Sequence, residues 1–169
     1  MMRNTKPQEP RMTLRSARVV GVIAVAIAAT ALIAPIALGS AGSGATTTVL
    51  GHRATLWNAI QVNEDRIKFQ TKDATDIQTQ TITFIPGGFS GWHHHPGVIL
   101  VVVESGTVTV HDENCQTLTF GPHESFIEGG PGAMMVSNQG SVDAVVYATQ
   151  VAPAGSAFRL EDDPPPCAG

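Results

Sequence analysis

Residues 86–111 read PGGFSGWHHHPGVILVVVESGTVTVH, and this stretch decides the expected fold. At its centre, Val98–Val103 is a continuous apolar run, which is typical of a strand buried on both faces. Gly and Pro residues precede the run, and Ser105-Gly106 makes a tight turn after it. The segment Thr107–His111 then resumes a strand-like pattern. The stretch therefore predicts two short strands joined by a turn.

The same pattern of short strand-like segments and Gly/Pro turns continues on both sides of this stretch. A hard turn is expected at residues 129–132, and no helical period of useful length occurs. Seven or eight short, closely spaced strands predict an all-β fold, an antiparallel sandwich or barrel. The other expected strands are Asp76–Ile85, Gln116–Phe120, Ser125–Ile127, Ala133–Ser137 and Ala144–Val151. Residues 46–75 are mixed and add two short strand-like pieces, Thr47–Leu50 and Arg66–Thr71.

Three consecutive histidines lie just before the apolar run. Strand alternation places His93 and His95 on one face and His94 on the other. Two imidazoles on one face can converge on a single cation, and imidazole suits Zn, Cu, Fe or Ni. The alternative is a polar strand end whose histidines are only solvated. The spacing makes His93 and His95 the candidate metal ligands.

The segment Gly87-x5-His93-x-His95, followed by Gly106, resembles the first motif of the cupin superfamily. Residues 121–138, with turn glycines and a closing Asn138, resemble its second motif. The resemblance covers residues 76–151. It implies an antiparallel jelly-roll β-barrel that, in metal-bearing members, holds a divalent ion with three His and one Glu. Residues 46–75 are then an N-terminal arm with short strands, and residues 152–169 a C-terminal tail.

The sequence departs from the cupin motifs at two ligand positions. The motif Glu falls at Ile99 or Leu100, neither of which can ligate, and the third His falls at Met134. The thioether of Met134 is a soft ligand suited to Cu(I), although a Met in that place more often fills core volume. These departures predict a site without a carboxylate, and so without the 2-His-1-carboxylate set.

The N-terminal region predicts export. Arg11, Arg15 and Arg18 precede an apolar run over residues 19–38, and small residues follow it. Residues 1–45 are therefore interpreted as a signal peptide, or an uncleaved membrane anchor, plus a linker. Either reading predicts an extracellular or cell-envelope protein. In that setting Cys115 and Cys167 are expected to form a disulfide.

Composition narrows the function classes. A net charge of −4 and a pI near 5.8 exclude nucleic acid as an expected partner. The leading hypothesis is an exported cupin-domain protein that binds a small ligand or a divalent ion (Zn, Cu, Ni, Fe or Mn), weakly or without catalysis. Membrane contact is expected only through the N-terminal segment, and a homodimer is compatible with the fold. The alternatives are a metal-dependent enzyme of dioxygenase, isomerase or decarboxylase type, and a structural or interaction barrel, so catalysis is left open.

Overall fold

The computed structural model describes residues 41–168 of the chain. The predicted signal or anchor segment, residues 19–38, lies outside the described residues. Within them, no helix is long and apolar enough to cross a bilayer.

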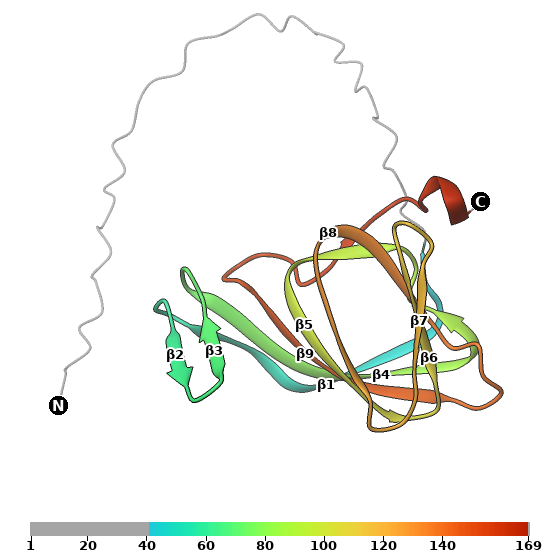
Figure 1. Ribbon diagram of the computed structural model, residues 1–169, viewed down its shortest axis with the longest axis horizontal. Helices are drawn as coiled ribbons and strands as arrows, with labels where there is room; N and C mark the ends of the chain where they lie inside the picture. The colour runs from blue at the N-terminus through green and yellow to red at the C-terminus, as the bar shows by residue number, and fades with distance from the viewer. Residues whose placement is uncertain (1–40, 169) are drawn as a thin grey trace, which may run out of the picture. The chain divides into compact units, whose positions relative to one another are not determined.

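The described residues form antiparallel strands wrapped into a barrel (Figure 1). Along the main sheet the order is β1-β4-β9-β5-β8-β6-β7, β8 also touches β4, and β10 pairs with β5. Strands β2 and β3 form a separate hairpin. This arrangement confirms the expected all-β antiparallel barrel. The elements are β1 (Ser43–Leu56), β2 (Gln61–Glu64), β3 (Ile67–Gln70), β4 (Thr75–Phe89), β5 (His93–Ser105), β6 (Val108–Asp112), β7 (Thr117–Phe120), β8 (Ser125–Ser137), β9 (Ala144–Pro153), β10 (Leu160–Glu161) and a 3₁₀ turn at Pro166–Ala168.

The apolar run at the centre of β5 is not buried on both faces, which corrects the sequence-based prediction. Ile99, Val101 and Val103 are at most 3% exposed, whereas their neighbours Val98, Leu100 and Val102 are 44–46% exposed. The barrel wall is one sheet thick, so every second side chain points outward. The inward set joins side chains from β4, β6, β8 and β9 in one core: Phe84, Val108, Val136, Ala144, Val146 and Ala148.

Strand β8 is also longer than expected. It runs without a break from Ser125 to Ser137, and the predicted turn at residues 129–132 is an irregularity within the β5–β8 ladder. On the other side of β5, the backbones of β5 and β9 lie very close together. A Cβ added at Gly97 of β5 would lie 2.0 Å from the Val151 carbonyl oxygen of β9. Gly97 therefore allows β5 to bend against β9 just after the histidines.

Asn138, which closes the second motif, acts as a structural clamp. It is 1% exposed, and its side-chain amide donates to the carbonyl oxygens of Phe84 (2.9 Å) and Val142 (2.7 Å). Its Oδ1 accepts the Gly140 N–H at 2.9 Å. The buried amide is thus fully paired and ties the β8–β9 turn to β4.

Residues 153–168, hereafter the strap, are ordered along the barrel (Figure 1). A disulfide joins Cys167 to Cys115, with a Cα–Cα distance of 6.1 Å. Nearer the barrel, β10 pairs with the start of β5, with Glu161 opposite His93. The Asp162 N–H also donates to the Trp92 carbonyl at 3.0 Å. The strap is therefore fixed beside the histidine cluster.

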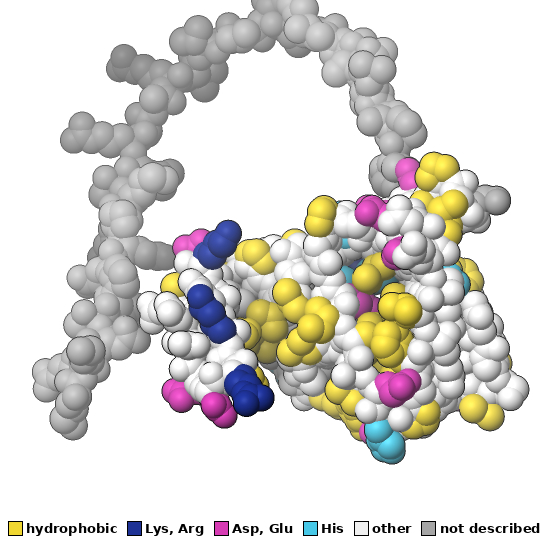
Figure 2. Space-filling model, in the orientation of Figure 1, with side chains coloured by type: hydrophobic (Ala, Val, Ile, Leu, Met, Phe, Trp, Pro, Cys, Tyr) yellow, Lys and Arg dark blue, Asp and Glu magenta, His cyan; other side chains and the backbone are white. Residues whose placement is uncertain are grey.

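Basic side chains are unevenly distributed. In the described part of the chain they are Arg53, Arg66, Lys68, Lys72 and Arg159. Lys and Arg side chains gather over the β2–β3 hairpin (Figure 2). Outside this hairpin, the described residues therefore carry few Lys and Arg side chains.

Candidate metal centre

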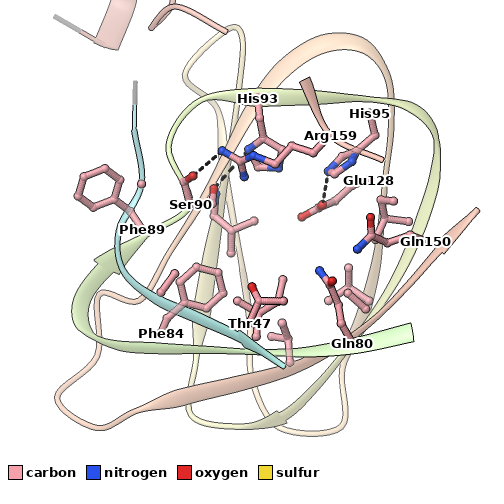
Figure 3. Close-up of a pocket in the computed structure, with 18 of the residues that line it drawn as sticks. Thr47, Gln80, Phe84, Phe89, Ser90, His93, His95, Glu128, Gln150 and Arg159 are labelled. Carbon is pink, nitrogen blue, oxygen red and sulfur yellow. Dashed lines mark hydrogen bonds and ion pairs between the residues drawn. The ribbon is translucent and has the colours of Figure 1, made fainter. Parts of the chain in front are cut away.

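The barrel encloses a cavity of about 700 Å³ with a polar end and an apolar end (Figure 3). Histidine and acidic side chains are visible in a hollow of the barrel surface (Figure 2). The volume is in the range that small-molecule sites occupy. Polar lining residues are Thr47, Gln80, Ser90, His93, His95, Glu128, Gln150, Arg159 and Glu161, and the apolar ones include Ile82, Phe84, Phe89, Ile99, Val101, Phe126, Val136 and Val146.

His93 begins β5 and points into this cavity as a neutral imidazole. Its Nδ1 donates to the Gly91 carbonyl oxygen at 2.9 Å, which leaves a lone pair on Nε2. Gly91 adopts a left-handed conformation (φ 75°), which favours glycine at this turn. Burial, and secondarily the Arg159 guanidinium, lower the pKa of His93 to about 4. His93 therefore needs no deprotonation to ligate at neutral pH.

His95 lies two residues further along β5 on the same inner face. Its Nδ1 is 2.6 Å from the Phe158 carbonyl oxygen of the strap, a contact in which Nδ1 donates. In the neutral ring this hydrogen bond places the free lone pair on Nε2. The two rings are perpendicular, with centroids 4.8 Å apart.

Glu128 of β8 supplies the carboxylate that the sequence analysis did not find. Its Oε2 lies 3.1 Å from His95 Nε2, and the side chain is buried. In the β5–β8 ladder Glu128 is directly opposite Ile99, one of the two positions where the motif Glu was expected. The carboxylate thus enters the same part of the barrel from the neighbouring strand. The expectation of a site without a carboxylate is wrong.

The ligand atoms of His93, His95 and Glu128 all lie within 4.8 Å of one another. His95 Nε2 is buried and has no hydrogen-bond partner among the described residues, yet it faces a carboxylate oxygen. Two acceptors at this distance repel unless a proton or a cation lies between them. A metal ion would satisfy the Nε2 lone pair and the carboxylate together. The residues present therefore fit a divalent ion.

The other histidine and methionine candidates lie elsewhere. His94 points outward, and its Nδ1 is 2.8 Å from Asp162 Oδ2 in the strap. Met134 pairs with His93 in the ladder and is not among the cavity-lining residues. His111 is half-buried and its Nε2 lies 2.9 Å from the Ser137 hydroxyl.

Sequence reasoning missed Glu128 because the strand was expected to end at Ile127. A period-2 reading extended by one residue would have placed Glu128 on the inner face with Phe126. It also missed Arg159, which lies in a tail with no strand or helix pattern. Contacts to the strap could not be inferred from local sequence.

The strand order, the barrel and the inward histidine pair together define a cupin-type fold. Among solved structures, the chain is similar to a cupin-like protein from Thermotoga maritima (13% identity, TM-score 0.45, covering 52% of this chain and 65% of that one).

A second similar structure is a protein with a double-stranded β-helix domain from Klebsiella pneumoniae (19% identity, TM-score 0.47, covering 63% of this chain and 80% of that one). A third is a DMSP lyase (18% identity, TM-score 0.45, covering 55% of this chain and 46% of that one). The matched region spans less than two thirds of the first and third of these three structures. No protein-family model and no curated protein matches the sequence.

Proposed function

We propose that this protein is an exported cupin-type protein that binds a divalent transition-metal ion through His93, His95 and Glu128, with a small molecule in the adjoining cavity. The observation that carries the proposal is the buried His95 Nε2, which has no hydrogen-bond partner among the described residues and lies 3.1 Å from Glu128 Oε2. Both histidines have Nδ1 committed to a backbone carbonyl, so both present Nε2 for ligation. The Cys115–Cys167 disulfide supports an oxidising compartment outside the cytoplasm.

The metal proposal is tested by calorimetric titration of tag-free protein with Zn²⁺, Mn²⁺, Ni²⁺ and Cu²⁺. We expect one ion per chain in the wild type and no measurable binding in the His93→Ala/His95→Ala double variant. Glu128→Gln should weaken binding by at least about tenfold, because it removes a charged ligand but keeps the side-chain shape.

The matched controls are His94→Ala and Met134→Leu, which change a neighbouring histidine and the sulfur outside the cavity. Both should bind like the wild type. Equal affinity of the wild type and the double-alanine variant would show that His95 and Glu128 share only a proton, and would refute the metal centre.

A metal-dependent enzyme is the second candidate, and the presence of Glu128 favours it. Two histidines and one carboxylate form a set that leaves coordination positions open to substrates in non-haem iron enzymes. Here a bound ion would adjoin the 700 Å³ cavity. The two functions are separated by incubating a bound ligand with the metal-loaded protein and measuring the ligand's mass afterwards by mass spectrometry. A binding protein leaves the ligand unchanged, whereas an enzyme converts it to a product.

A further inference from the structure

The cavity carries a positive side chain beside the proposed metal centre. Arg159 is the one Lys or Arg among the residues that line it. Its Nη2 donates to the Ser90 carbonyl oxygen at 2.6 Å, which holds the guanidinium near His93 (Figure 3). A guanidinium in a cavity wall can donate a charge-assisted hydrogen bond to a carboxylate.

Glu161 does not use up the hydrogen-bonding capacity of Arg159. The Nε and Nη2 atoms of Arg159 pair with its carboxylate at 2.5 and 2.7 Å, and Nη1 has no partner among residues 41–168. Both hydrogens of Nη2 are engaged, one by Glu161 and one by the Ser90 carbonyl oxygen, so Nη1 is the atom left to donate. Arg159 can therefore donate a hydrogen bond from Nη1 to a carboxylate that enters the cavity.

Two glutamine side chains on β4 and β9 add polar groups to the cavity wall. Gln150 is 6% exposed, yet its amide has no hydrogen-bond partner among the described residues. Gln80 accepts one hydrogen bond from Gln78 at 3.3 Å, which leaves its NH₂ group free. Both amides face the cavity (Figure 3). These amide groups can hydrogen-bond the polar atoms of a bound ligand.

The net charge of the cavity with a divalent metal ion bound favours an anionic ligand. A divalent ion held by Glu128 and two neutral imidazoles leaves one positive charge, and Arg159 and Glu161 cancel each other. The chain as a whole has a net charge of −4, so this positive interior contrasts with its surroundings. Opposite charges attract, so this positive charge favours an anionic ligand.

We propose that the ligand of this cavity is a small organic anion, a carboxylate with an apolar body. The carboxylate binds Arg159 near the metal centre, the amides of Gln80 and Gln150 bond its polar atoms, and the apolar wall around Phe84 and Phe126 receives the body. The inference rests on the proposed metal function for part of the positive charge.

The test compares carboxylates with neutral amides of the same shape. Phenylacetate and hexanoate, with phenylacetamide and hexanamide as isosteres, are titrated into the Zn²⁺-loaded full chain by calorimetry. Each carboxylate should bind at least about tenfold more tightly than its amide, as a charge-assisted hydrogen bond predicts. Arg159→Gln should remove this preference, and Arg159→Lys should keep part of it. Arg66→Gln, at the turn of the β2–β3 hairpin, is the matched control and should behave like the wild type.

Circular dichroism and Zn²⁺ titration of each variant report folding and metal binding separately. Equal affinity for carboxylate and amide, an unchanged preference in Arg159→Gln, or no binding of any of the four probes would overturn the inference. If Zn²⁺ fails to bind but phenylacetate binds in an Arg159-dependent way, the anion site stands and the metal centre falls. If Zn²⁺ binds normally and no preference exists, only the anion site falls.

Discussion

At the scale of single residues, His93 shows how burial changes the chemistry of a common side chain. It is 3% exposed, and its pKa is lowered to about 4 by burial first and by Arg159 second. In the unfolded chain the same group titrates near 6.5. Between these values the unfolded state binds a proton that the folded state does not, so stability is highest above pH 6.5 and falls as the pH drops towards 4.

We therefore expect the metal-free wild type to lose up to about 3 kcal/mol of unfolding free energy over this pH range on account of His93. His93→Gln should lose correspondingly less, because glutamine does not titrate. Urea denaturation at several pH values between 4 and 7 measures the difference. His52→Gln, at an exposed position, is the control. Parallel pH profiles for the wild type and His93→Gln would contradict the prediction.

At the scale of elements, the strap is part of the site rather than an appendage. Its Phe158 carbonyl orients His95, Asp162 contacts His94, and the disulfide from Cys167 to Cys115 fixes its far end. Loss of the bridge should lower the unfolding free energy by about 2–4 kcal/mol, since the unfolded chain is no longer constrained. It should also weaken metal binding, because the hydrogen bond that sets the His95 tautomer becomes less well held.

Reduction of the wild type with dithiothreitol should reproduce both effects, as measured by urea denaturation and Zn²⁺ titration. The Cys115→Ser/Cys167→Ser variant, which has no bridge, is the control and should be insensitive to the reductant. Unchanged Zn²⁺ affinity after complete reduction would show that the remaining contacts hold the strap without the bridge.

At the scale of the whole molecule, the proposed ligands come from two strands that meet only in the folded barrel. His93 and His95 belong to β5 and Glu128 to β8. A metal that binds only the folded state stabilises it by about 2.7 kcal/mol when its free concentration is 100 times the dissociation constant. Saturating Zn²⁺ should therefore raise the thermal midpoint of the wild type and leave the His93→Ala/His95→Ala variant unchanged. An equal rise in both, measured by circular dichroism, would place the binding elsewhere.

The barrel and half of the candidate site could be predicted from local sequence. Short strands, Gly/Pro turns and the two-residue alternation of His93 and His95 are properties of neighbouring residues, and the structure has the antiparallel barrel and both rings on its inner face. The run Val98–Val103 was misread, because an apolar strand reads alike whether one face or both are covered. Only the tertiary structure shows that the wall is one sheet thick.

The other half of the site depends on contacts between distant segments. Glu128 is a metal candidate because the β5–β8 register sets it opposite Ile99, and Arg159 reaches the cavity because β10 pairs with β5. A shift of one residue in the β5–β8 register would turn Glu128 to the outer surface. Which register forms depends on the faces that the folded barrel buries, and so on contacts between segments far apart in the sequence. For this reason the sequence alone determined the barrel and the histidine pair, whereas the carboxylate and the arginine were decided by tertiary structure.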